Sequence, residues 1–269
     1  MGENLKTKAY NHIRQNLLMG QWPEGAFFST GKIARNMGMS YTPVREAMIQ
    51  LESEGLVETV TNQGVRTKML NREELQEKFE LRIILESGAS RLAAEKITEE
   101  ELNELRKLIQ QHRYYLREFR NEYAAGTYKS PVLSETGGRE IYQINVYLHL
   151  GIMRASRNPQ LIKLIGDLHI LTRVLRTRAA LPSEHHLRQM LRDYYFHRRV
   201  VRALEKRDSQ AVSYWMERHI RDAMRHHLSV LDYLERLHSR EQLRAIEIPE
   251  FWLKPVVKAE NELSEDEKP

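Results

Sequence analysis

Residues 38–47 read GMSYTPVREA, and this stretch decides the fold of the first part of the chain. Gly38 suits the left-handed position that ends a short helix over Thr30–Met37. Thr42 is a favourable N-cap for the next helix. Pro43 fits its first position, where the N–H that proline lacks would have no partner within the helix. The stretch therefore predicts two helices joined by a tight turn.

The sequence on both sides of this turn completes a small domain. Leu5–Met19 has the apolar spacing of a helix with one buried face, and Pro43–Glu54 carries a similar stripe. Two short strands are predicted over Val57–Val60 and Val65–Lys68, joined by the hairpin turn TNQG at 61–64. A helix, a helix-turn-helix and a two-stranded ribbon, in this order, indicate a winged helix-turn-helix.

The start of the second helix of the pair has the residues that a DNA-recognition helix needs. That end enters the major groove, where hydroxyls and a helix N-terminus can contact phosphates and an arginine can reach a phosphate or a guanine edge. In the wing, Gly64 beside Arg66 would let the backbone approach DNA closely. The alternative is a small helical domain with an ordinary solvated surface. The candidate residues of the helix are Ser40, Tyr41, Thr42 and Arg45.

Composition sets wider limits. The chain has 42 basic and 37 acidic residues and a net charge of +5, which permits nucleic-acid binding without establishing it. The absence of cysteine excludes disulfides, thiolate nucleophiles and zinc–thiolate sites. No apolar run approaches the roughly 18 residues that span a membrane, and the N-terminus lacks the apolar region of a signal peptide. We therefore expect a cytoplasmic protein with no membrane partner.

The rest of the chain reads as helix. Residues 71–239 are predicted to form an all-helical domain, interrupted by a loop at 124–140 that is rich in Gly, Ser, Thr and Pro. Residues 240–269 are predicted to form a C-terminal tail that ends in a solvated acidic run. With the winged domain at 1–70, the expected fold is mainly α, a winged helix-turn-helix followed by a helical bundle.

Three predicted helices of the second domain each carry a histidine on their apolar stripe. A buried imidazole needs a hydrogen-bonding or metal partner, and imidazoles that converge are suited to a divalent metal. The alternative is three core histidines, each satisfied by a tyrosine, an asparagine or a carbonyl group, and periodicity leaves both interpretations open. His169 also faces an apolar stripe and could line the same cavity. The residues are Asn145 and His149 on Ile141–Ser156, His197 on Glu184–Lys206, and His219 on Ser209–Glu235.

The run at 38–47, followed by LESEGLV at 51–57 and the Gly64-Val65 wing, closely resembles the GntR family of bacterial transcription regulators. The resemblance implies that Ser40, Thr42 and Arg45 contact operator DNA. It also implies that Gly64 lies at a wing tip near the minor groove.

Two positions depart from that family pattern. The family commonly has Arg where this chain has Tyr41, and a basic residue where this chain has Gly31. Lys32 or Arg35 is expected to supply the phosphate contact instead. The departures affect the base preference rather than the mode of binding.

A second resemblance covers most of Asn71–Glu235, which is similar to the helical ligand-sensing FCD domain of the FadR subgroup. In the metal-binding branch of that subgroup, an Asp or Asn and three His hold a divalent ion, often zinc or nickel. The resemblance gives these roles to Asn145, His149, His197 and His219. The branch usually has Asp at the position of Asn145, and a neutral ligand leaves more positive charge on the ion. The motifs that carry the resemblance are Leu81-Arg82, LESGA at 85–89, Asn145 with His149, ASRN at 155–158, His197, and His219-Ile220.

These observations lead to the hypothesis of a metabolite-responsive transcription regulator. A homodimer would place two recognition helices on a near-palindromic operator. The metal would bind a small carboxylate, with Arg82 as a second anion contact and His169 beside it. Two alternatives stay open at this point: a DNA-binding regulator whose histidine cluster is purely structural, and a helical metallohydrolase. No spacing places a general base, so we expect that the protein is not an enzyme.

Overall fold

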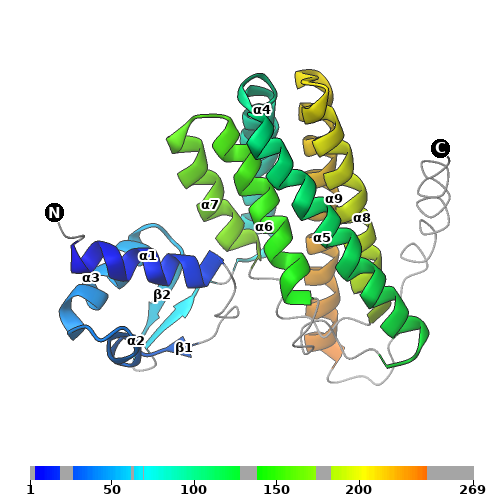
Figure 1. Ribbon diagram of the computed structural model, residues 1–269. Helices are drawn as coiled ribbons and strands as arrows, with labels where there is room; N and C mark the ends of the chain where they lie inside the picture. The colour runs from blue at the N-terminus through cyan, green and yellow to red at the C-terminus, as the bar shows by residue number, and fades with distance from the viewer. Residues whose placement is uncertain are drawn as a thin grey trace. The chain divides into compact units, whose positions relative to one another are not determined.

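The structure is a computed structural model that describes residues 4–18, 27–61, 64–68, 70–127, 138–173 and 183–240. Within these ranges the chain forms nine α-helices and three β-strands (Figure 1). The described residues group into two compact units. One unit combines those of Met1–Leu85 with those of Asn158–Ala179, and the other combines those of Glu86–Arg157 with those of Ala180–Pro269.

The first unit begins with a winged helix-turn-helix, which confirms the predicted fold of this part. Helices α1 (Leu5–Leu18), α2 (Thr30–Asn36) and α3 (Tyr41–Ser53) bury one apolar face each. Gly38 has φ 63°, as expected for the residue that ends α2. The fully buried core residues of α1 and α3 are Ala9, Ile13, Val44, Ala47 and Leu51.

The wing has one strand more than predicted. Strands β2 (Val57–Val60) and β3 (Gly64–Thr67) form the expected antiparallel pair, and β1 (Phe27–Phe28) adds to the other edge of β3. Phe28 lies opposite Val65 in this register. A two-residue strand has no alternation of apolar and polar side chains, so periodicity does not reveal it. The middle of the predicted turn, residues 62–63, lies outside the described residues.

The predicted start of the recognition helix was wrong by two residues. Ser40, with extended backbone angles (φ −67°, ψ 162°), is the N-cap, and α3 begins at Tyr41. Pro43 therefore occupies the third helical position rather than the first. It is accommodated because the N–H groups of the first helical turn have no partner within the helix. Thr42 lies inside the first turn and not at the cap.

Two further helices contribute to the first unit. Helix α4 (Arg72–Lys96) follows the wing, and its residues up to Leu85 belong to this unit. Helix α7 (Pro159–Arg173) packs against α1, although it comes about 140 residues later in the chain. Of α4, Leu75 and Phe79 are fully buried in the core.

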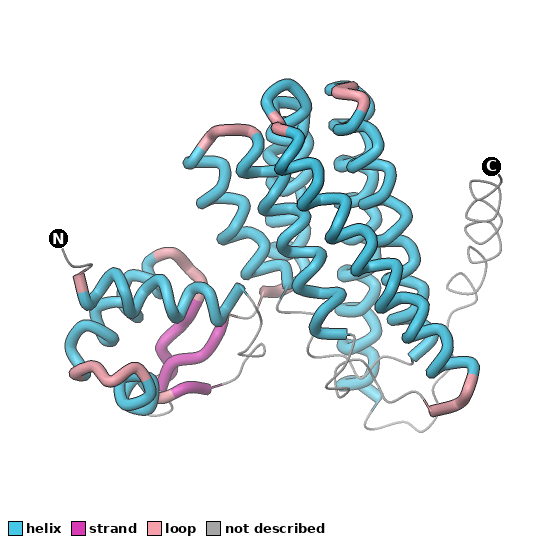
Figure 2. The backbone as a smooth tube through the Cα atoms, in the orientation of Figure 1, coloured by secondary structure: helices cyan, strands magenta, loops and turns pink. Residues whose placement is uncertain are grey.

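The second unit is a bundle of long helices that run side by side (Figure 2). Helix α8 (Ser183–Glu205) contacts α5 (Glu99–Ala124), α6 (Gly138–Ala155) and α9 (Ser209–Arg240). A capping box at Thr98 and Glu101 begins α5. One apolar cluster of the bundle is made by Leu116, Phe119, Ile141, Met190 and Tyr194.

The predicted loop at 124–140 was too long at both ends. Ala124 is the last residue of α5, and α6 begins at Gly138, so residues 138–140 are helical. Residues 128–137 lie outside the described part of the chain, as do residues 241–269 of the predicted tail. Among the helices that the structure describes, none has the length and apolar character needed to cross a membrane.

Candidate metal centre and DNA-reading surface

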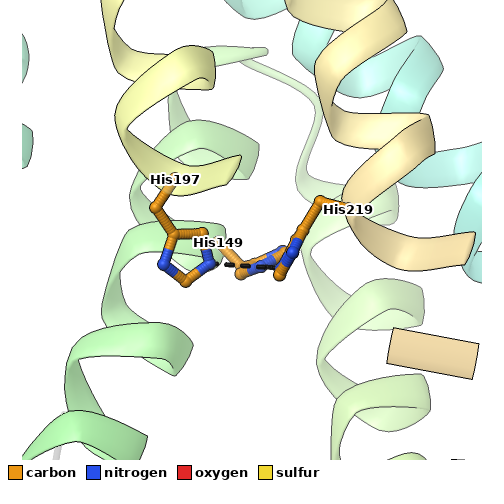
Figure 3. A group of neighbouring side chains, drawn as sticks. All are labelled: His149, His197 and His219. Carbon is orange, nitrogen blue, oxygen red and sulfur yellow. Dashed lines mark hydrogen bonds between the residues drawn. The ribbon is translucent and has the colours of Figure 1, made fainter. Parts of the chain in front are cut away.

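Three buried imidazoles from three different helices of the second unit meet at one point (Figure 3). His149 on α6, His197 on α8 and His219 on α9 are each at most 2% exposed. The Nε2 atom of His219 lies 3.0 Å from Nε2 of His149 and 3.2 Å from Nε2 of His197. Each histidine is buried, as its apolar stripe predicted, and the packing of the three helices brings the rings together.

The donor set fits a divalent ion better than it fits a set of hydrogen bonds. An imidazole nitrogen offers either one N–H or one lone pair in the ring plane, so Nε2 of His219 can form a good hydrogen bond with only one of its two neighbours. Three lone pairs that share one cation satisfy all three Nε2 atoms. In tetrahedral zinc sites with Zn–N of about 2.0–2.1 Å, ligand nitrogens are about 3.3 Å apart. The separations of 3.0 and 3.2 Å are close to this value.

Glu86 on α4 contacts Nδ1 of His149, the ring nitrogen that does not face His219. Its Oε2 atom lies 2.5 Å from Nδ1 of His149, and both side chains are fully buried. We place the proton on Nδ1, where it is donated to the carboxylate, because this leaves the lone pair of Nε2 directed at the other two histidines. Histidine ligands of metals commonly have such a carboxylate partner, which fixes the tautomer and makes the ring more basic.

Each of the other two rings has one further polar neighbour. Asp193 on α8 is buried, and its Oδ1 lies 3.9 Å from Nδ1 of His219, which is too long for a direct hydrogen bond. Asn145 on α6 is largely buried, with Nδ2 3.5 Å from Nε2 of His197. A 180° rotation of the carboxamide exchanges Nδ2 and Oδ1 with little change of shape, so its oxygen can face the imidazoles.

The two predicted effector contacts lie together in the first unit. Arg82 on α4 donates from Nη1 to Oγ1 of Thr172 at 3.0 Å, and its Nη2 lies 3.2 Å from Nε2 of His169. All three side chains are buried. The guanidinium also lies over the ring of Phe79, 5.2 Å from its centroid. Arg82 is thus a buried guanidinium that donates toward two polar groups on α7, and its planar fork has the geometry that pairs with a carboxylate.

The predicted DNA-reading residues lie on the surface of the winged domain. Tyr41 is 55% exposed, and Ser40, Thr42 and Arg45 are exposed beside it at the start of α3. On α2, Lys32 and Arg35 are also exposed.

In the wing, the two predicted contacts differ in their surroundings. Gly64 has φ 103°, a conformation that favours glycine, and it is exposed at the tip. Arg66 donates to Glu58 at 2.7 Å and lies over the Phe27 ring, 5.8 Å from its centroid, so it is already engaged within the sheet.

Sequence reasoning missed Glu86 and Asp193. Glu86 is fully buried on α4, and a charged residue on a buried stripe is the signal that could have identified it. Asp193 lies next to Tyr194 in the chain and both are buried, so helical periodicity does not single out Asp193.

A winged helix-turn-helix followed by a helical domain is the architecture of a DNA-binding transcription regulator. Comparison with known protein families agrees with this class. Residues 5–66 match the gntR family of bacterial regulatory proteins, and residues 77–222 match the FCD domain, which is more than half of the chain. The chain belongs to the GntR family of transcription regulators and carries an FCD domain.

Individual relatives are regulators as well. The chain is 26% identical over 226 residues to the HTH-type transcriptional regulator YdhC of Bacillus subtilis, covering 83% of this chain and 91% of that protein. It is 28% identical over 168 residues to the regulator McbR of Escherichia coli, with 62% and 68% covered. The solved structure of E. coli McbR/YncC shares the fold, with a TM-score of 0.69, 21% identity, and 87% of this chain and all of that chain covered. These relatives are regulators and not enzymes, so the metallohydrolase interpretation is dropped.

Proposed function

We propose that this GntR-family regulator senses a small carboxylate metabolite through a divalent metal, zinc or nickel, held by His149, His197 and His219 with Asn145. The observation that carries the proposal is the close approach of three buried Nε2 atoms: that of His219 lies 3.0 Å from that of His149 and 3.2 Å from that of His197. When bound, the ion would offer an open coordination position to a carboxylate oxygen. The chain's own residues orient the rings, exclude water and supply the second anion contact.

Arg82 is the residue that we assign to the second anion contact, with His169 beside it. It comes four residues before Glu86 in α4, so both lie on one face of that helix. Its planar fork matches a carboxylate bidentately, and an incoming carboxylate competes with Thr172 and His169 for the same N–H groups. An anion at Arg82 would therefore change how α4 and α7 are held together.

On the DNA side, α3 would enter the major groove by its N-terminal end, with Ser40, Thr42 and Arg45 facing the operator and Gly64 at the wing. We propose a homodimer that acts in the cytoplasm, with its two recognition helices about 34–36 Å apart on a near-palindromic site. Lys32 and Arg35 would contact phosphates, which makes operator binding dependent on salt concentration.

Elemental analysis of untagged protein, before and after chelation, tests the metal part of this function. About one zinc or nickel ion per chain supports the proposal. No bound metal, even after reconstitution, favours the alternative that the histidine cluster is structural. The same alternative gains support if chelation lowers the melting temperature and leaves the DNA affinity unchanged in the presence of candidate carboxylates.

An Arg45→Ala variant tests the recognition helix. We expect operator affinity to fall by about 1–3 kcal/mol if Arg45 contacts a base, with relaxed specificity at that base pair. The measurement is fluorescence anisotropy at fixed salt on a duplex selected by the wild-type protein. Arg91→Ala, an exposed arginine on α4, is the control. Equal losses in both variants, or none in Arg45→Ala, would contradict the assignment.

An Asn145→Asp variant tests the fourth ligand. A carboxylate at this position adds a negative charge beside the cation, so we expect tighter retention of zinc, measured as a lower dissociation constant in a competition titration with a chelator. The extra charge also lowers the net positive charge that attracts a carboxylate, so binding of anionic effectors should weaken. An unchanged zinc affinity would place residue 145 outside the ligand set.

A further inference from the structure

Helix α7 lies within residues 77–222, which match the FCD domain. In the structure, however, it belongs to the same compact unit as the DNA-binding helices. An ion pair links it to α1. Arg14 on α1 donates from Nε at 2.9 Å and from Nη2 at 2.5 Å to Oδ1 of Asp167 on α7. The two side chains are 21% and 17% exposed, so water screens this pair less than an ordinary surface pair.

Gly166 makes this close approach possible. A Cβ atom at this position would lie 2.8 Å from Nη2 of Arg14, which is closer than such contacts allow. Because Gly166 has no side chain, the guanidinium can lie against the helix, where Nη2 also reaches the carbonyl oxygen of Lys163 at 3.3 Å. Glycine inside a helix is less favourable than alanine, and here the contact with Arg14 offsets that disadvantage.

A second link joins α7 to the end of the recognition helix. Nζ of Lys163 lies 3.1 Å from Oδ2 of Asp167 and 3.4 Å from Oε1 of Glu54, the C-cap residue of α3. The hydroxyl of Tyr10 on α1 donates to the other oxygen of Glu54 at 2.7 Å. Burial is the largest cause of a raised pKa at Tyr10, and the hydrogen bond to Glu54 adds to it. The phenol therefore stays protonated and donates to Glu54. One network thus connects α1, α3 and α7.

The opposite face of α7 holds Arg82. At about 100° per residue, Lys163 and Asp167 lie on the side of α7 away from His169 and Thr172, and Gly166 lies between the two groups, about 60° from Lys163 and from His169. His169 and Thr172 are the two α7 residues that contact the Arg82 guanidinium. A rigid helix therefore has the proposed effector contact on one face and the two DNA-binding helices on the other.

We propose that α7 transmits the state of the Arg82 site to the DNA-binding domain, with Asp167 and Gly166 as the positioning residues. When Arg82 leaves Thr172 and His169, α7 loses its hold on α4 and shifts. The Arg14–Asp167 and Lys163–Glu54 pairs carry that shift to α1 and α3. The physiological trigger, an anion at Arg82, rests on the proposed function, whereas the link through α7 exists without metal or effector.

A double-mutant cycle tests the link, since coupling between two positions is measured by the failure of their effects to add. Thr172→Val removes one partner of Arg82, and Gly166→Ala displaces Arg14 while favouring the helix. The dissociation constant is measured on chelated full-length protein, in carboxylate-free buffer at fixed salt, with a duplex selected by the wild-type protein from a random pool. Asp167→Asn provides a second way to break the pair.

We expect Thr172→Val to change the DNA dissociation constant at least about fivefold in the wild-type background, the lower end of typical allosteric coupling. In the Gly166→Ala and Asp167→Asn backgrounds the change should be less than about twofold. In the Leu164→Ala background, an exposed position of the same helix, the full change should persist. Equal changes in all backgrounds, or none in the wild type, would overturn the proposal. His169→Gln removes another partner of Arg82 and replaces Thr172→Val if that variant folds poorly.

This experiment contains neither metal nor effector, so its result is separate from that of the proposed function. If the link fails while zinc binds at one ion per chain, the sensing role stands and another element carries the signal. If zinc does not bind while the cycle shows coupling, the link stands and the metal centre is wrong.

Discussion

In a His219→Ala variant, we expect the affinity for zinc to fall by about 10²–10³-fold. Structural zinc sites with four ligands have apparent binding free energies of about 10–16 kcal/mol, so one ligand accounts for about 2.5–4 kcal/mol. His219 is the suitable position because its Nε2 contacts both other histidines, at 3.0 and 3.2 Å. Its loss therefore leaves His149 and His197 without a shared centre.

The measurement is a competition titration with a chromophoric chelator, together with metal content per chain. His226→Ala is a matched control, because His226 lies on the same helix, two turns later, and is partly exposed. We expect it to bind zinc like the wild type. Circular dichroism of both variants separates metal loss from unfolding. One ion per chain in His219→Ala, bound with wild-type affinity, would remove this residue from the ligand set.

For Glu86→Gln, the expected result is a 10- to 100-fold loss of zinc affinity, roughly the effect of removing a carboxylate partner from a histidine ligand. The substitution keeps the size of the side chain and removes its charge. The neutral amide makes His149 less basic. If its NH2 group faces Nδ1, the imidazole proton moves to Nε2 and occupies the lone pair that would bind the ion.

Glu95→Gln provides the matched control, since it changes the same residue type at an exposed position of the same helix. Zinc affinity should be unchanged there. A third variant, Glu86→Asp, keeps the charge but shortens the side chain by one methylene group. Its zinc affinity should lie between that of Glu86→Gln and that of the wild type. If Glu86→Gln binds zinc as tightly as Glu95→Gln does, the 2.5 Å contact with His149 serves the fold and not the metal.

Much of the fold was predictable because it depends on local chemistry. A glycine such as Gly38 is suited to the positive φ that ends a helix, and the apolar residues of α3 recur with the period of an α-helix. The helix start was misplaced because Ser40 and Thr42 are both good N-caps and Pro43 is tolerated anywhere in the first turn. Strand β1 was missed because its two residues are recognised only by their partners on β3.

The candidate site was predictable only in part. The period of each helix shows that His149, His197 and His219 face inward, but it does not show whether they meet, because the rotation and height of one helix against another depend on packing across the bundle. Resemblance to a family supplied that expectation, and the Nε2 separations agree with it. The assignment of DNA-contacting residues stays a prediction, because these residues are exposed and their proposed contacts are with DNA rather than with other parts of the chain.

Two features depend entirely on contacts between segments distant in the chain. Glu86 meets His149 across 63 residues, and Arg14 meets Asp167 across 153 residues. A carboxylate on a buried stripe, or a glycine inside a helix, indicates that a partner is needed without naming it. Local patterns determine which face of a helix is buried and where the helix begins and ends. The partner of each buried charge is determined by three-dimensional packing, because only that packing brings the two groups within a hydrogen bond of each other.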